Sequence, residues 1–214
     1  EFMSKQGYNL RRYGDYFVST PAYKLMARID WNINDNHKIN VRFTRSHTKD
    51  SNSPSTSVSP MTASKIYPGL ESEGVKAGNG RGSRYALTFE NSRYYKDKNF
   101  TSIAGEWNSK WMGGKLNNVL RATYSFQDEP RSYEGKDMPT VDILKDGALY
   151  ASFGPDIFTV GNLAQTKTTV ITDELLWSTG IHNFTGGLQF EMTDAINGYM
   201  QAGNGYYVYS SMDD

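Results

Sequence analysis

The chain has 214 residues, with 23 Lys and Arg against 23 Asp and Glu, no cysteine, and a mean hydropathy of -0.64. The lack of cysteine excludes disulfides and cysteine-based zinc sites, and the balanced charge excludes a dedicated nucleic-acid binder, which needs a basic excess. No run of about 18 apolar residues is present, so a transmembrane helix is excluded, whereas a membrane β-barrel is not, because its strands alternate apolar and polar residues. Aromatic residues reach 14%, which favours strands over helices.

The first predicted element is a β-hairpin near residues 23–47. Apolar residues from Tyr23 to Ile33 alternate with polar and charged ones, which is the two-residue period of a strand with one apolar and one polar face. The sequence NDNH at positions 34–37 is typical of a tight turn. The alternation then resumes as far as Phe43, which predicts the returning strand.

Two further hairpins are predicted near residues 99–127 and 163–193. The second hairpin turns at MGGK, positions 112–115, and the third turns at TGIHN, positions 179–183. Both returning strands alternate clearly, whereas the first strand of the third hairpin alternates less cleanly.

Long polar connections separate the hairpins, near residues 48–98, 128–162 and 194–214. Structureless loops of this length are rare in a compact soluble domain, whereas short turns alternating with long loops are typical of an outer-membrane barrel. Shorter alternations within the connections, at 84–91, 140–144 and 149–153, are interpreted as strands of the outer loops that prolong the barrel wall.

The predicted fold is therefore all-β: an antiparallel segment of a large transmembrane β-barrel with long extracellular loops. Trp31, Trp111 and Trp177 lie near the short turns, where tryptophan is favoured at a membrane interface. The three hairpins give fewer strands than the roughly eight of the smallest single-chain barrels, so the chain is expected to be a portion of a larger barrel. The alternative is a soluble β-sandwich, such as a carbohydrate-binding or adhesin module, because its strands alternate in the same way.

Three segments resemble a known family. They are RIDWNINDNHKINVRF at 28–43, EWNSKWMGGKLNNVLRATYSFQDEPRS at 106–132 and GIHNFTGGLQFE at 180–191, with MPTVDIL at 138–144 between the last two. They resemble barrel hairpins of TonB-dependent outer-membrane receptors, most closely the Oar-like branch of the Bacteroidetes. The resemblance implies a 22-stranded barrel in the outer membrane of a Gram-negative cell, with a plug domain inside it. It also implies contact with TonB and with outer-membrane lipid, and uptake of a bulky nutrient. The chain shows no plug domain, so the resemblance covers part of the barrel.

Two groups of residues are candidates for functional sites. Charged side chains on the polar faces of the strands are expected to face the barrel lumen and to form salt bridges with one another or with the plug; these are Arg28, Asp30, Arg42, Glu106, Lys110, Arg121 and Glu191. Four tyrosines in GYMQAGNGYYVYSS at 198–211 are the candidate substrate-contact loop, unless this segment is a strand that continues the wall, which is the preferred interpretation; they are Tyr199, Tyr206, Tyr207 and Tyr209.

No catalytic, cofactor or metal site is predicted. The three histidines, His37, His47 and His182, belong to separate hairpins, and no Ser/His/Asp arrangement is local enough to predict a hydrolase. Acidic residues of the connections, such as Asp142, lack EF-hand spacing and are expected to be solvated. The glycine-rich stretch at 78–83 lacks the Gly-Lys-Ser/Thr ending of a phosphate-binding loop.

Overall fold

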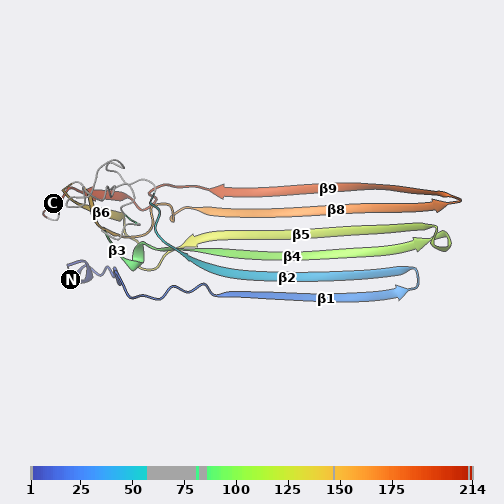
Figure 1. Cartoon of the computed structure of the whole chain (residues 1–214), viewed down its shortest axis with the longest axis horizontal. Helices are drawn as coiled ribbons and strands as arrows, with labels where there is room; N and C mark the ends of the chain where they lie inside the picture. Colours follow the sequence, from blue (N-terminus) through green and yellow to red (C-terminus); the bar gives the residue numbers. More distant parts are fainter. Residues whose placement is uncertain (1, 57–80, 82–85, 147, 212, 214) are drawn as a thin grey trace, which may run out of the picture.

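The computed structural model describes residues 2–56, 81, 86–146, 148–211 and 213. These residues form two β-sheets, one short α-helix, α1 (Phe2–Lys5), and short 3-10 helices. The large sheet occupies most of the length of the molecule, and both chain termini lie at one end of it (Figure 1). Within the described residues, no helix is long and apolar enough to cross a membrane.

The large sheet contains six strands and is antiparallel throughout. Its strands follow the order β1 (Ala22–Asn34), β2 (His37–Asn52), β4 (Tyr94–Trp111), β5 (Leu116–Ser132), β8 (Leu163–Thr179) and β9 (His182–Gly198). The prediction of an all-β chain with antiparallel strands is confirmed. The sheet is open, because β1 and β9 are its edges and no described strand pairs with their outer sides. We call this sheet the wall.

All three short turns lie at the end of the wall away from the chain termini (Figure 1). In the first turn the Asn34 side-chain oxygen accepts hydrogen bonds from the backbone N–H groups of Asn36 and His37, both at 2.9 Å. The second turn is the short 3-10 helix η4 (Met112–Gly114), where Gly113 and Gly114 have φ of 66° and 87°. Glycine adopts such positive angles without the steric cost that a Cβ atom brings.

The strand register separates an apolar face of the wall from a polar one. One row across the six strands reads Ile29, Val41, Gly105, Ala122, Ile171 and Phe190. The adjacent row reads Asp30, Asn40, Glu106, Arg121, Thr172 and Gln189. Successive side chains of a strand point to opposite faces, so the two rows lie on opposite sides of the sheet. The alternation in the sequence is therefore continued coherently across all six strands.

No described part of the chain covers the apolar face. Ile29 is 73% exposed, Trp31 61% and Leu188 83%, although they lie on strands that pair regularly. Apart from proline, the buried hydrophobic side chains of the described residues all lie between Met138 and Ile157, outside the wall. The wall therefore has no hydrophobic core of its own on either face.

The second sheet lies at the end of the wall that carries the chain termini (Figure 1). It has four strands in the order β10 (Tyr206–Tyr209), β6 (Thr140–Lys145), β7 (Ala148–Phe153) and β3 (Leu87–Thr88), and a 3-10 helix, η3 (Glu90–Ser92), follows β3. β10 and β3 pair in parallel with their neighbours. We call residues 86–93, 138–162 and 199–209 the cap.

The cap corrects two expectations from the sequence. The alternations at 140–144 and 149–153, and the described part of 84–91, belong to this separate sheet and do not prolong the wall, whereas residues 84 and 85 lie outside the described residues. The long connections are also not structureless: Met138, Val141 and Phe153 form a buried cluster against which Met3, Leu10 and other side chains of the chain pack. The sequence analysis missed this core because its strands β6 and β7 are short, and because β3 and β10, which complete the sheet, lie dozens of residues away from them.

Candidate functional site

A charged network crosses the polar face of the wall. Arg121 on β5 donates from Nε to Glu106 of β4 at 2.8 Å and from Nη1 to Glu174 of β8 at 2.9 Å. The other oxygen of Glu106 accepts hydrogen bonds from the amides of Asn40, at 3.2 Å, and Asn108, at 2.7 Å. The network therefore links four neighbouring strands, and it forms the kind of bridge between wall strands that the sequence analysis expects.

Arg28 and Asp30 lie beside this network on the edge strand β1. Their ion pair has two short contacts, with Nε 2.9 Å from Oδ2 and Nη2 2.7 Å from Oδ1. Arg28, Arg42, Glu106 and Arg121 together line a depression of about 180 Å³ on the polar face. The structure thus brings together five of the charged residues that the sequence places on one face.

The remaining two residues of this group lie apart. Lys110 is close to the second turn, and Glu191 is on the edge strand β9, opposite Val170 in register. Glu174 and the two asparagines of the network were missed by the sequence analysis. Glu174 belongs to β8, the strand that alternates least cleanly. The alternation is interrupted there because the neighbouring residue Asp173, a charged side chain, lies on the apolar face. There the Asn118 amide donates to Asp173 at 2.5 Å.

A larger cavity of about 350 Å³ lies between the wall and the cap. We call it the wall–cap cavity. On the wall side its lining includes Lys96 and Glu129, which form an ion pair, and Arg131, all from strands β4 and β5. On the cap side it includes Phe158 and Tyr199, whose rings stack with centroids 6.0 Å apart. Lys96, Glu129 and Arg131 lie on the polar face, as the register of β4 with β5 shows.

The four tyrosines of the candidate substrate-contact loop have three different environments. Tyr199 lines the wall–cap cavity. Tyr207 and Tyr209 are exposed on β10, and Tyr206 points into the interior of the cap. The prediction of a strand in this segment holds for Tyr206–Tyr209, but the prediction that it continues the wall is wrong, because β10 pairs with β6 of the cap.

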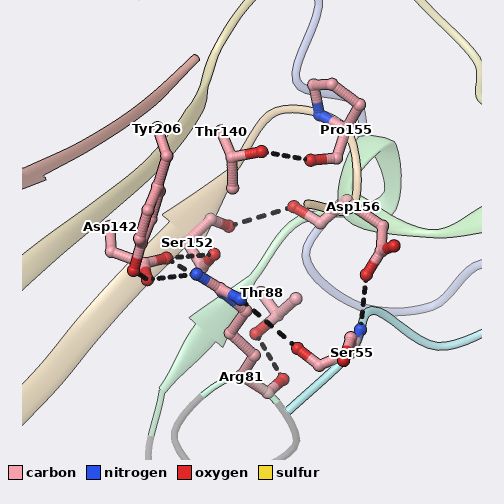
Figure 2. Close-up of polar contacts among 10 residues, drawn as sticks. Ser55, Arg81, Thr88, Thr140, Asp142, Ser152, Pro155, Asp156 and Tyr206 are labelled. Atoms are coloured by element: carbon pink, nitrogen blue, oxygen red, sulfur yellow. Dashed lines mark hydrogen bonds and ion pairs between the residues drawn. The ribbon is translucent and has the colours of Figure 1, made fainter. Parts of the chain in front are cut away.

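A buried ion pair holds the cap together (Figure 2). Arg81 donates from Nη2 to Oδ2 of Asp142 at 2.6 Å and from Nε to Oδ1 at 3.2 Å. Asp142 also accepts hydrogen bonds from the hydroxyls of Ser152 on β7 and Tyr206 on β10, both at 2.7 Å. The Asp142 side chain is fully buried, so the expectation that this carboxylate is solvated is wrong.

The environment of Asp142 affects its partners. Burial, and then the hydrogen bond to Asp142, raises the pKa of the Tyr206 hydroxyl well above its ordinary value. Burial by itself lowers the pKa of Arg81, but the hydrogen bonds and the charge of Asp142, together with Tyr206 and Asp156, raise it by more. Both groups are therefore held in their protonated forms, in which they donate to the carboxylate.

The same network reaches the wall–cap cavity. Arg81 Nη1 donates to the backbone oxygen of Ser55 at 3.4 Å, and the backbone N–H of Ser55 donates to Asp156 at 2.6 Å (Figure 2). The other oxygen of Asp156 accepts hydrogen bonds from the N–H of Phe158, at 3.0 Å, and from the hydroxyl of Thr159. Phe158 and Asp156 both line the cavity, so the buried ion pair helps to position its cap side.

The histidines do not converge. His37 packs against Trp107 and Trp111, His47 hydrogen bonds Asn99, and His182 packs against Phe184. Among the described residues, no group of three or more His, Asp or Glu side chains is arranged to hold a metal ion. The glycine-rich stretch at 78–83 lies outside the described residues except for Arg81.

Comparisons of the chain with protein-family models, with curated proteins and with solved structures find no match. The geometry itself offers binding groups: a charged polar face, and a cavity lined by aromatic rings and paired charges.

Proposed function

We propose that the chain forms part of the wall of a transmembrane β-barrel, in an outer-membrane receptor of the TonB-dependent, Oar-like type. The observation that carries this proposal is the uncovered apolar face of the wall, on which Ile29 and Leu188 are more than 70% exposed. Soluble proteins rarely expose a continuous apolar surface of this extent, whereas a barrel turns such a surface toward lipid.

The lengths of the apolar runs support a membrane-spanning role. On β1 the alternating apolar residues extend from Tyr23 to Ile33, and on β5 from Leu116 to Phe126. A barrel strand tilted by about 45° needs about 9–11 residues to cross the hydrocarbon core of a bilayer. The strands themselves are longer, up to 18 residues, and extend beyond the apolar band toward the cap.

The distribution of aromatic residues is also that of a membrane interface. Trp31, Trp111 and Trp177 all lie at the end of the wall that carries the short turns. Amphipathic indole rings are favoured where the hydrocarbon meets water. In the proposed orientation this end faces the periplasm and the cap lies on the extracellular side.

The charged network then faces the lumen, where its groups are hydrated or paired. The open edges of β1 and β9 are the positions at which further wall strands pair, because a membrane-spanning sheet leaves no edge unpaired. A plug domain, TonB and outer-membrane lipid are the partners that the sequence resemblance implies, and uptake of a bulky nutrient is the implied activity.

The soluble β-sandwich is the less favoured interpretation. A sandwich covers the apolar face of one sheet with a second sheet about 10 Å away. Here the second sheet lies beyond the end of the wall (Figure 1) and leaves the apolar face exposed.

Fractionation of cells that make the protein tests the proposal. We expect the protein in the outer-membrane fraction, where it resists extraction by alkaline carbonate. A soluble periplasmic protein in the same cells serves as the control that carbonate releases. Recovery of this protein in the soluble fraction would contradict the proposal.

A further inference from the structure

We propose that the wall–cap cavity binds a ligand that carries a carboxylate next to a ring, with Arg131 holding the carboxylate and Tyr199 contacting the ring. This inference rests on the proposed receptor function, in which the polar face lines the lumen through which a ligand passes. It adds the chemical class of the ligand and the residues that select it.

The first step is an excess of positive charge on the wall side of the cavity. Lys96 on β4 and Arg131 on β5 are directly opposite each other in the strand register. Like charges at such positions repel and destabilise the strand pair. The nearby carboxylate of Glu129 forms its ion pair with Lys96 and receives a second hydrogen bond from Gln127 at 2.7 Å. Glu129 is therefore engaged with Lys96 and leaves Arg131 without a counter-charge.

The second acidic residue of the cavity does not supply that counter-charge. Asp156 is 3% exposed, and its oxygens already accept three hydrogen bonds, from the N–H groups of Ser55 and Phe158 and from the Thr159 hydroxyl. In the described part of the chain, the ion pairs do not include Arg131. The formal charges of the lining cancel, but their geometry leaves Arg131 as the group that an anionic ligand neutralises.

Arg131 also has hydrogen-bonding capacity to spare. Its guanidinium lies over the Tyr94 ring, with Cζ 5.0 Å from the ring centroid. Its Nη1 donates one long hydrogen bond, of 3.4 Å, to the backbone oxygen of Phe158. A guanidinium has five N–H donors in a planar fork that matches the two oxygens of a carboxylate. The Tyr94 ring and the carbonyl hold this fork in place before a ligand arrives.

Tyr199 supplies a flat surface in the same cavity. Its ring stacks on Phe158 at an interplanar angle of 30°, yet the residue remains 69% exposed. The cavity of about 350 Å³ is within the range of about 300–1,000 Å³ that is usual for small-molecule sites. A ring with an apolar face, from a sugar acid or an aromatic acid, can therefore lie on Tyr199 while its carboxylate contacts Arg131.

Binding measurements with matched probes test this inference. Glucuronate and benzoate are the acidic probes, and glucose and benzyl alcohol are their neutral counterparts. Isothermal titration calorimetry is done on the protein purified in detergent, in the form that the cell makes. We expect at least one acid to bind about tenfold or more tightly than its neutral counterpart, because the counterpart lacks the charge-assisted hydrogen bonds. Binding of glucuronate identifies a sugar-acid ligand, and binding of benzoate an aromatic one.

Variants of the cavity assign the binding to its residues. Arg131→Gln is expected to weaken acid binding about tenfold or more, and Arg131→Lys by less, because lysine keeps the charge but not the fork. Tyr199→Ala is expected to weaken the acids and their neutral counterparts alike. The control is Lys98→Gln, which removes a neighbouring cation that pairs with Asp50 and does not line the cavity.

Several outcomes overturn the inference: failure of both acids to bind, equal binding of acids and neutral probes, or acid binding that Arg131→Gln leaves unchanged. If a variant does not fold, the comparison of acids with neutral probes on the unaltered protein still tests whether the protein prefers a ligand with a carboxylate. The proposed receptor function fails separately, by recovery of the protein in the soluble fraction, because the binding assay does not depend on where the protein is found.

Discussion

Two substitutions on one strand separate a lipid-facing wall from a sheet that is exposed to water. Ile29 and Met26 are both apolar residues of β1, with exposures of 73% and 68%. Ile29 lies on the apolar face, opposite Val41, and Met26 lies on the polar face, opposite Thr44. In water, replacing either exposed side chain with arginine is expected to change the free energy of unfolding by no more than about 0.5 kcal/mol.

In a bilayer the two changes differ greatly. On β1 the apolar band runs from Tyr23 to Ile33. Ile29 lies near the middle of this band. An arginine at the bilayer midplane on the lipid side of a barrel costs about 2–4 kcal/mol, which corresponds to roughly a 30-fold to several hundred-fold change in the folding equilibrium. Arginine in place of Met26 stays in the hydrated lumen, so Met26→Arg is the matched control.

The assay is equilibrium unfolding by guanidinium of the protein folded into lipid vesicles, with the strand signal in circular dichroism as the readout. We expect Ile29→Arg to lower the unfolding free energy by about 2–4 kcal/mol and Met26→Arg to have little effect. Equal and small effects of the two substitutions would refute the assignment of the apolar face to lipid.

Two further predictions concern the cap. Asp142→Asn leaves the Arg81 cation buried without its partner. Breaking a buried ion pair in this way costs about 3–5 kcal/mol of folding free energy. We therefore expect faster proteolysis of the cap and faster hydrogen exchange of its backbone amides. The control is Asp50→Asn, which breaks a more exposed ion pair with Lys98 and should leave both rates unchanged. Unchanged rates for Asp142→Asn would argue against a stabilising role of the Arg81–Asp142 pair. The pKa of Tyr206 is raised in the folded cap. The stability that the Tyr206 hydroxyl contributes is therefore complete below the ordinary tyrosine pKa of about 10. It decreases as the pH rises above this value, because the unfolded chain then loses the tyrosine proton more readily than the folded one. Stability of the cap is therefore measured at pH 9 and at pH 11. Tyr206→Phe should lose less stability between these two pH values than the unaltered protein does. Equal losses would contradict the burial of the Tyr206 hydroxyl against Asp142.

The candidate sites were predictable to different degrees. The side of the strand on which Arg28, Glu106 and Arg121 lie follows from the two-residue period alone, because successive residues of a strand alternate between its faces. That Arg121 bridges Glu106 and Glu174 does not follow, since it requires β8 to pair with β5 in one particular register. The wall–cap cavity was also beyond prediction, because its cap side is formed by Asp156, Phe158 and Tyr199, which lie in connections between strands and reach the wall only in the folded chain.

The sequence by itself determined the wall: its strands, its short turns, its apolar and polar faces and the tryptophans near the turns. Each of these features depends on neighbours a few residues apart, so a local period reveals it. Only the tertiary structure decided the cap, where β3 and β10 join the neighbouring strands β6 and β7 from distant segments, and where Arg81 meets Asp142 across 61 residues of sequence. Such contacts have no period in the sequence, and a carboxylate in a polar connection looks solvated until the fold buries it.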